Sequence, residues 1–340
     1  PALRTAVTNA YLLCRIADTI EDEPAIAPAE TLELLERFKD VTAGRAGADA
    51  LARDLARRLS DRTLPAERDL VARMAVIVRV TARFTTAQRA AIVRCVELMC
   101  YGMPRFQSNA SLRGLARSSD LDDYCYYVAG VVGEMLTELF CEYSPAIATH
   151  AEALRGRAIS FAQGLQMTNI LKDVWDDRSR GACWLPREVF GRYDCDLAEL
   201  RAVPYTAGFG EGVRELIGVA HAHLRNALDY TLLIPRTEPG IRRFCLWAIG
   251  LAVLTLRKID ANPRFTAGSE VKVSHTAVAL TRLLTGASLG SDGALRSLFT
   301  WTARRLPLAE LPAPTRGPSP AVDLTAAQDA ARRREGSSRA

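Results

Sequence analysis

The sequence lacks the residue patterns that usually hold zinc. Its eight cysteines include no CxxC pair, and its four histidines include no H-x-x-x-H pair. His221 and His223 are only two positions apart and would not share a helix face, so a zinc site is not expected. Several cysteines lie in apolar helical patterns, where a reduced thiol packs as a small hydrophobic group. This usage predicts a reducing, cytoplasmic compartment.

A hydrophobic run long enough to span a bilayer is also missing. The longest apolar stretch, residues 244–256, is closed by Arg243 and Arg257 and is shorter than the ~20 residues that a span needs. A buried helix is expected there, while peripheral contact with the inner face of a membrane stays open. The net charge of +5 is modest and the basic residues are interleaved with acids, so nucleic-acid binding is not expected.

Runs of β-branched residues are sparse, whereas Ala, Leu and Arg are abundant, a composition that favours helix. Gly102 and Pro104 are expected to end one of the helices. Residues 1–303 are predicted to form one all-α domain, and the Pro-, Ala- and Arg-rich residues 304–340 a flexible tail. Periodic apolar positions predict helices at residues 1–21, 31–38, 46–60, 66–82, 85–101, 120–143, 148–177, 210–232, 238–260 and 271–286.

Two acidic clusters stand out against this helical background, DTIED at residues 18–22 and DVWDD at residues 173–177. Each places carboxylates four residues apart, and positions i and i+4 lie on the same face of a helix. Each cluster therefore offers a short column of oxygen ligands. Such ligands suit Mg²⁺, which bridges a few carboxylates to substrate phosphates. Two facing columns would form a metal-dependent cavity that binds a diphosphate.

The second cluster continues a polar stripe formed by Gln166 and Asn169 on an otherwise apolar helix. Lys172, Arg178 and Arg180 are cations that could hold a diphosphate. The alternative is an ordinary helix end with mixed charges. The first cluster, taken alone, fits an amphipathic surface helix better than a binding site. Together the two clusters favour the binding site.

Both clusters lie within longer motifs that resemble the squalene/phytoene synthase family. Residues 11–22 (YLLCRIADTIED) are similar to the family's first aspartate-rich motif, and residues 166–177 (QMTNILKDVWDD), running on to GACWLP at 181–186, to its second. Residues 122–133 (DDYCYYVAGVVG) resemble the stretch that carries a tyrosine near the reacting carbons, which falls on Tyr124. The resemblance covers roughly residues 1–290 and is closer to the squalene synthases, of bacterial type, than to the phytoene synthases.

The resemblance implies a helical isoprenoid-synthase fold with a central cavity, a monomer, and head-to-head coupling of two farnesyl diphosphates. Tyr124 and the four aspartates Asp18, Asp22, Asp173 and Asp177 would be catalytic. Mg²⁺ would be held by these aspartates with Glu21 and Asn169, and NADPH would reduce the intermediate presqualene diphosphate. The residues expected to contact substrate are Arg15, Gln166, Asn169, Lys172, Arg178 and Phe244, and Lys272 in the VKVSH segment is expected to contact the cofactor.

Other readings remain open. A relative of the same family could stop at presqualene diphosphate, or make dehydrosqualene or phytoene, without the reductive step. A helical scaffold of the same fold without catalysis is a reading of another class. The family usually has an upstream helix with a Ser-Arg phosphate contact, and the sequence begins after it, at Pro1.

Overall fold

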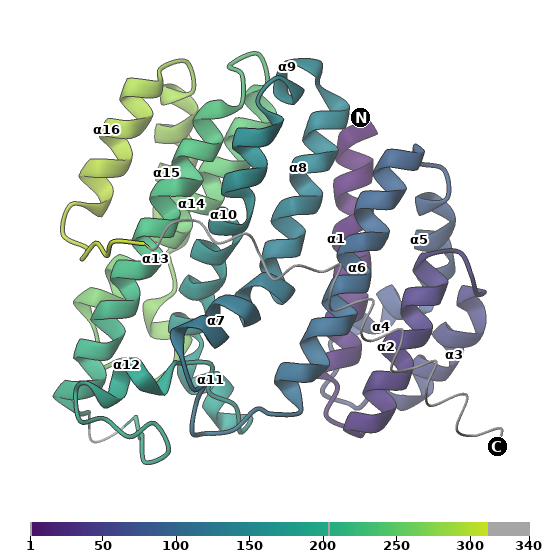
Figure 1. The fold of residues 1–340 in the computed structure, drawn as a ribbon, viewed down its shortest axis with the longest axis horizontal. Coiled ribbons are helices and arrows are strands. Elements are labelled where there is room, and N and C mark those ends of the chain that lie inside the picture. Colours follow the sequence, from purple (N-terminus) through teal and green to yellow (C-terminus); the bar gives the residue numbers. More distant parts are fainter. Residues whose placement is uncertain (1, 203–204, 312–340) are drawn as a thin grey trace.

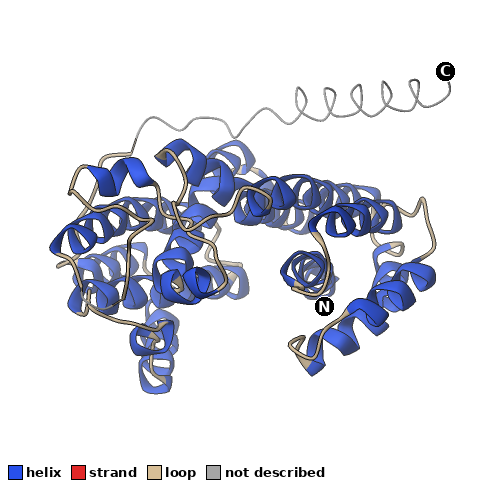
Figure 2. Cartoon of the chain, turned by 90° about the horizontal axis from the view of Figure 1, so that it is seen from below, coloured by secondary structure: helices blue, strands red, loops and turns tan. Residues whose placement is uncertain are grey.

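The computed structural model describes residues 2–202 and 205–311, and within them the regular structure is helical (Figure 2). No strand forms in this part of the chain, where one isolated bridge joins Leu115 to Pro186. The helices make one all-α domain, as predicted. The sequence places apolar residues at helical spacing almost throughout, so each helix has a face to bury against a neighbour.

Helices α1–α6 form the right side of the bundle in Figure 1, and the chain then crosses through α7 to α8 in the middle. The long helices α1 and α6 pack against each other, with α8 beside both. The elements are α1 (Ala2–Asp22), α2 (Pro28–Thr42), α3 (Ala48–Arg58), α4 (Pro65–Ala72), α5 (Met74–Thr81), α6 (Thr86–Gln107), α7 (Ser118–Cys125), the π-helical segment η1 (Tyr126–Gly130) and α8 (Val131–Tyr143).

From α10 on, the second half forms the left side (Figure 1), where α10, α13 and α14 pack on one another. The elements are α9 (Pro145–Ala148), α10 (Ala151–Lys172), α11 (Val174–Ser179), α12 (Arg187–Gly191), α13 (Ala207–Leu233), α14 (Pro239–Ala261), the 3-10 turn η2 (Gly268–Val271), α15 (His275–Ser288) and α16 (Asp292–Ala303). Because α8 packs on both α6 and α10, it joins the two halves.

Two glycines of the α7–α8 region sit where another side chain or helix comes close. A Cβ on Gly133 would lie 2.5 Å from the carbonyl oxygen of Ala158 on α10, so only glycine lets these helices approach so closely. A Cβ on Gly130 would meet the ring of Tyr126 at 3.0 Å. The contact between Gly133 and Ala158 sets the distance between α8 and α10.

The structure differs from the predicted helices in several places. The predicted helix 66–82 is divided at Arg73, whose backbone angles (φ −94°, ψ 8°) separate α4 from α5, and α12 and α16 were not among the predicted helices. Helix α6 runs through Gly102 and Pro104 to Gln107, so the predicted end near Gly102 is wrong. The predicted helix 120–143 contains the π-helical segment Tyr126–Gly130. The predicted helix 148–177 is interrupted at residue 150 and again at Asp173, whose backbone angles (φ −97°, ψ 11°) depart from the helix and separate α10 from α11. Apolar periodicity does not reveal such local changes of winding.

The chain after α16 is packed for longer than the predicted tail boundary at residue 304 allows. Leu306 is buried. The N–H of Ala309 donates to the carbonyl of Gly218 on α13 at 3.1 Å, and the carbonyl of Pro307 lies 2.8 Å from Nδ1 of His221. Residues 304–311 therefore belong to the domain, and the rest of the predicted tail, 312–340, lies outside the described residues. No helix in the described part of the chain is long and apolar enough to cross a membrane.

Candidate active site

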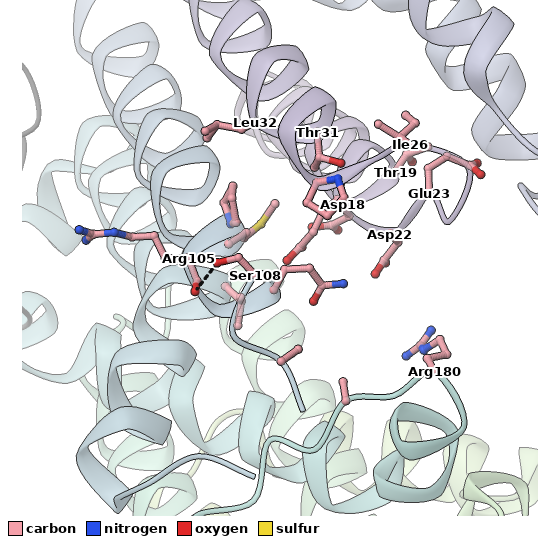
Figure 3. A pocket seen from close by; sticks show the side chains of 18 of the residues that line it. Asp18, Thr19, Asp22, Glu23, Ile26, Thr31, Leu32, Arg105, Ser108 and Arg180 are labelled. Carbon is pink, nitrogen blue, oxygen red and sulfur yellow. Dashed lines mark hydrogen bonds between the residues drawn. The ribbon is translucent and has the colours of Figure 1, made fainter. Parts of the chain in front are cut away.

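One large cavity, of about 1740 Å³, lies between the two halves of the bundle and is lined by residues of both acidic clusters. Helix α1 contributes Asp18, Glu21 and Asp22. Asp173 and Asp177 line the same cavity from the α10–α11 junction. The fold thus brings together two clusters that are about 150 residues apart in the sequence. In Figure 3, Asp18 and Asp22 lie on one side of the pocket and Arg180 on another.

The periodicity of α1 explains why its carboxylates reach the cavity. Leu13, Ile16 and Ile20 are fully buried in the core on one side of the helix, which leaves the 18 and 22 positions on another side. Burial, with a smaller contribution from Asp22, raises the pKa of Asp18 to about 6 even though Arg15 opposes the shift. Burial and the two neighbouring aspartates raise the pKa of Glu21 to about 8.

Arg15 lies at the edge of the first cluster. Its guanidinium contacts the Asp18 carboxylate at 3.1 Å and also donates a hydrogen bond to Glu67 of α4. Glu67 lines the cavity as well, although no motif or spacing singles it out. Arg15 therefore fixes the rotamer of Asp18 while it remains part of the cavity wall.

In the second cluster, the break in the helix at Asp173 does not interrupt the hydrogen-bond chain. The N–H of Asp173 donates to the carbonyl of Asn169, and the N–H of Asp177 to that of Asp173, both at 2.8 Å. Asn169 and Gln166 line the cavity one and two turns earlier, respectively. The polar stripe predicted along α10 is thus continuous with the acidic cluster in space.

Arg180 is the cation that connects the two clusters. Its guanidinium donates to Oδ1 of Asp177 at 2.6 Å. Burial raises the pKa of Asp22, and the positive charge of Arg180 is the first influence that opposes this rise. Arg180 lines the cavity, so it is placed to contact an anion held between the clusters.

The structure does not bring the other two cations of this region to the cavity wall. Arg178 donates hydrogen bonds to the carbonyls of Leu112 (3.1 Å) and Leu200 (2.8 Å), which ties two loops together. Lys172 forms an ion pair with Asp173 at 3.1 Å. Neither is among the residues that line the cavity. The sequence predicts that Arg178 and Lys172 contact substrate. Spacing alone, however, does not determine which way three neighbouring cations point.

Phe244 and Lys272 also lie away from the cavity. Phe244 is exposed on α14. Lys272 is exposed just after η2, and its carbonyl accepts a hydrogen bond from Nζ of Lys258 at 2.8 Å. The backbone of η2 does approach the second cluster, since a Cβ on Gly268 would meet Oδ1 of Asp173 at 3.0 Å. Neither Phe244 nor Lys272 lines the cavity. The structure therefore does not support the predicted role of Phe244 in substrate binding or of Lys272 in cofactor binding.

Tyr124 of α7 lies in the cavity wall, half-buried. Its ring stacks on that of Trp184, with centroids 4.3 Å apart and planes 10° apart, and meets the edge of Phe106 at 5.3 Å. Burial, together with the nearby carboxylates of Glu21, Asp177 and Asp22, raises the pKa of the Tyr124 phenol well above its usual range. The hydroxyl therefore stays protonated and can donate a hydrogen bond.

Apolar side chains complete the cavity beside the polar groups. Met103, Val128, Ile170 and Trp184 line it, and Met103 and Ile170 are also part of the buried core. The cavity thus has a charged region, suited to a diphosphate, and an apolar region, suited to a hydrocarbon chain.

The oxygen-bearing side chains around the cavity suit a Mg²⁺ ion that is shared between the protein and a substrate phosphate. The available ligands are carboxylate and amide oxygens, which hard cations prefer. Among residues 2–202 and 205–311, no three His, Cys, Asp or Glu side chains gather closely enough to hold an ion by themselves. Mg²⁺ typically binds through one or two carboxylates with water and substrate phosphate, so a diphosphate would supply the missing oxygens.

The chain is similar to known proteins over most of its length. The profile of the family described as squalene/phytoene synthase matches residues 1–277. The chain is 31% identical over 279 residues to squalene synthase ERG9 of Candida albicans, covering 79% of this chain and 58% of that protein. It is 28% identical over 267 residues to squalene synthase 1 of Arabidopsis thaliana, covering 75% and 58%. The chain therefore spans little more than half the length of these curated relatives.

Two solved structures share the fold. The complex of TcSQS with the ligand BPH1237 superposes with a TM-score of 0.71 at 23% identity, covering 92% of this chain and 87% of that one. A dehydrosqualene synthase in complex with a ligand superposes with a TM-score of 0.56 at 21% identity, covering 84% and 87%. At these identities the likeness concerns the arrangement of helices.

Proposed function

Because the chain belongs to the squalene/phytoene synthase family, we propose that it is a prenyltransferase that couples two farnesyl diphosphates head to head and converts the product to squalene. The observation that carries the proposal is the single cavity lined by both acidic clusters, by Tyr124 and by apolar side chains. The similarity to curated squalene synthases supports farnesyl diphosphate as the substrate.

In this proposal the charged region of the cavity holds the diphosphate groups. Mg²⁺, held by Asp18, Glu21, Asp22, Asn169, Asp173 and Asp177, would neutralise the diphosphate and help it leave. Arg15 and Arg180 add fixed positive charge at the two clusters. Within the first cluster, burial and the neighbouring aspartates raise the pKa of Glu21 to about 8, and burial with a smaller contribution from Asp22 raises that of Asp18 to about 6, so like charges repel one another there. Binding of cations and a cation-bridged anion relieves that repulsion.

The apolar region would protect the reacting carbons. The bond from C1 of one farnesyl chain to its diphosphate breaks, and the diphosphate leaves with the electron pair. The double bond of the second chain attacks the resulting allylic cation, and loss of one proton closes the cyclopropane ring of presqualene diphosphate. Met103, Val128 and Ile170 line the cavity and would keep water from the cation.

Tyr124 would orient the reacting groups as a hydrogen-bond donor. Its phenol is held protonated, because burial and nearby carboxylates raise its pKa, so it is a poor base at neutral pH. We assign the role of proton acceptor to the released diphosphate, which would lie in the charged region beside Arg180.

The reduction to squalene is the finer part of the proposal and rests on the similarity to curated squalene synthases. NADPH would supply the hydride. No residue is assigned to this cofactor, because Lys272, which the sequence suggested, does not line the cavity. A monomeric state and peripheral contact with a membrane belong to the same proposal.

Product analysis tests the reaction. The protein is incubated with farnesyl diphosphate and Mg²⁺, with and without NADPH, and the products are identified by mass spectrometry. We expect presqualene diphosphate without NADPH and squalene with it. Dehydrosqualene under both conditions would contradict the reductive step, and unchanged substrate would favour a helical scaffold without catalysis.

Variants of the two clusters test the site itself. Asp18→Ala and Asp173→Ala are expected to abolish turnover while circular dichroism shows the same helix content. Glu211→Ala, which removes an exposed carboxylate on α13, serves as the matched control and should leave turnover unchanged. Mg²⁺ with inorganic pyrophosphate should raise the melting temperature of the parent protein and of the control only. Near-normal turnover of either cluster variant would rule out the assigned metal site.

A further inference from the structure

The cavity wall contains one more cation, Arg62, which neither acidic cluster nor any sequence motif includes. Arg62 lies in the turn between α3 and α4, lines the cavity and is exposed to water. Within residues 2–202 and 205–311 its guanidinium has no ion pair or hydrogen bond. An arginine presents five N–H donors in a fixed plane. Arg62 therefore offers a complete set of donors to whatever enters the cavity.

The five other cations that line the cavity already have partners. Four of them form ion pairs with carboxylates, and the guanidinium of the fifth lies over the ring of Tyr101; they are Arg15, Lys39, Arg45, Arg180 and, over the ring, Arg105. A paired arginine must share or exchange its carboxylate partner before it binds an anion, which reduces the net gain. Arg62 exchanges only water, so its full interaction with an anion remains available.

Hydrogen bonds fix the turn that carries Arg62 against the end of the first acidic cluster. The N–H of Thr63 donates to the carbonyl of Ser60 at 3.0 Å and closes the turn. The Thr63 hydroxyl donates to Oε2 of Glu23 at 2.5 Å, and Glu23 directly follows Asp22 on the same side of the pocket (Figure 3). Thr63 and Glu23 are both buried, so water does not compete for this hydrogen bond and the turn is held in place.

The charges around Arg62 determine which anion it can bind. The neighbouring Asp61 is directed to another cation, since its carboxylate lies 3.9 Å from the guanidinium of Arg68. The carboxylates of Asp18 and Asp22 line the same cavity and would repel a bare anion. An anion that shares a Mg²⁺ ion with these carboxylates is attracted instead. A phosphate group that arrives with Mg²⁺ is therefore the ligand that suits both the cluster and Arg62.

We propose that Arg62 is a further substrate-binding residue, which contacts the diphosphate of a prenyl diphosphate at the first acidic cluster. Thr63 and Glu23 are its positioning residues. The phosphates of the reductant NADPH offer the same chemistry to a guanidinium, but the prenyl diphosphate is favoured because its Mg²⁺ satisfies the adjacent carboxylates. The assignment rests on the proposed function and adds the residue that holds the substrate from the α3–α4 side of the cavity.

Calorimetric titration of the full chain with inorganic pyrophosphate and Mg²⁺ tests the assignment. Arg62→Ala should weaken binding about tenfold. Arg62→Lys should weaken it less, because lysine keeps the charge but not the planar pair of donors. Arg53→Ala is the matched control, since Arg53 is exposed on the neighbouring helix α3 and is not among the residues that line the cavity. It should bind pyrophosphate as the parent does, and all three variants should keep the parent's melting temperature.

A second pair of variants tests the positioning role. Thr63→Val removes the hydroxyl that holds the turn to Glu23. It should weaken pyrophosphate binding in the parent but cause no further loss in Arg62→Ala, because it acts through Arg62. Equal losses from Thr63→Val in both backgrounds would overturn this role.

The remaining outcomes separate the assignment from the reaction. Equal pyrophosphate affinity of the parent and Arg62→Ala, or no binding by the parent, would overturn the assignment. Weaker binding of NADPH by Arg62→Ala with unchanged binding of pyrophosphate would also overturn it and identify the reductant as the ligand. Weaker pyrophosphate binding by Arg62→Ala supports the assignment even if the parent leaves farnesyl diphosphate unchanged, a result that would contradict only the proposed reaction.

Discussion

The ring of Tyr124 lies flat against the ring of Trp184, with the two centroids 4.3 Å apart. Tyr124 comes from α7 and Trp184 from the loop after the second acidic cluster. The stack therefore fixes the position of the phenol relative to that cluster. It joins two segments that the sequence separates by 60 positions.

Loss of this stack should reduce stability more than loss of the phenol hydroxyl. Trp184 is buried, so Trp184→Ala is expected to lower the free energy of unfolding by about 3–5 kcal/mol. Tyr124→Phe keeps the ring and should change it by less than about 0.5 kcal/mol, while it slows formation of presqualene diphosphate. Urea denaturation and single-turnover kinetics measure the two effects. Equal stability of Trp184→Ala and the parent would show that the stack is not structural.

Arg180 and Arg178 are two residues apart, but their substitution should affect different properties. Loss of Arg180 should weaken anion binding, whereas loss of Arg178 should lower stability. Arg180→Ala removes the cation between the clusters and should weaken binding of inorganic pyrophosphate with Mg²⁺ by about tenfold. Arg178→Ala removes the hydrogen bonds to Leu112 and Leu200 and should cost about 2–3 kcal/mol of stability. Calorimetric titration and urea denaturation of both variants check this. Weaker pyrophosphate binding in Arg178→Ala together with lower stability in Arg180→Ala would contradict these assignments.

Gly133 should not tolerate even a methyl group. In Gly133→Ala the added Cβ would lie 2.5 Å from the backbone oxygen of Ala158, so α8 and α10 must move apart, at a cost of about 1–3 kcal/mol. Gly156→Ala on α10 is the matched control, because its Cβ meets nothing within 4 Å. Alanine is the better helix former there and should stabilise the protein by up to ~1 kcal/mol. Thermal unfolding distinguishes the two, and destabilisation of similar size in both would contradict the close-contact explanation.

The buried His223 should make stability depend on pH. Its Nδ1 lies 2.8 Å from the hydroxyl of Ser160, which also accepts from the amide of Asn226 at 2.9 Å. This arrangement favours a hydroxyl that donates to a neutral imidazole. Burial lowers the pKa of His223 from 6.5 to about 4.

The direction in which stability changes with pH follows from proton binding. Between pH 6.5 and 4 the unfolded chain binds a proton at His223 that the folded protein excludes, so this contribution to stability is complete above pH 6.5 and lost as the pH falls towards 4. The full loss corresponds to about 3 kcal/mol. Urea denaturation across this range should show that His223→Gln lacks this part of the decline, whereas exposed His275→Gln keeps it. Parallel curves for the parent and His223→Gln would contradict the prediction.

Much of the fold was predictable because each helix has its own apolar period. The all-α class and most of the helices follow from local pattern. The junctions at Gly102, at Tyr126–Gly130 and at Asp173 were not predictable, because their geometry depends on tertiary contacts. Pro104 illustrates this, since α6 continues through it to Gln107, although proline usually ends a helix.

The candidate site was likewise predictable only in part. The i, i+4 spacing in each cluster indicated which carboxylates share a face, and the fold brings both faces to one cavity. Which of Lys172, Arg178 and Arg180 points into the cavity depends on the turn after Asp177, whose rotation a periodic pattern does not determine. Trp184 lies in the GACWLP segment that the motif includes, but its place against the ring of Tyr124 appears only in three dimensions.

The π-helical segment Tyr126–Gly130 limits how the chain between α7 and α8 can change in length. A π turn holds one residue more than the α-helical turn that could replace it. Deletion of one residue there would leave a continuous α-helix but rotate everything before it by about 100° relative to α8. Tyr124 would then leave the ring of Trp184, although every side chain of the site would still be present. Between α7 and α8, evolution can therefore exchange residues far more readily than it can remove one.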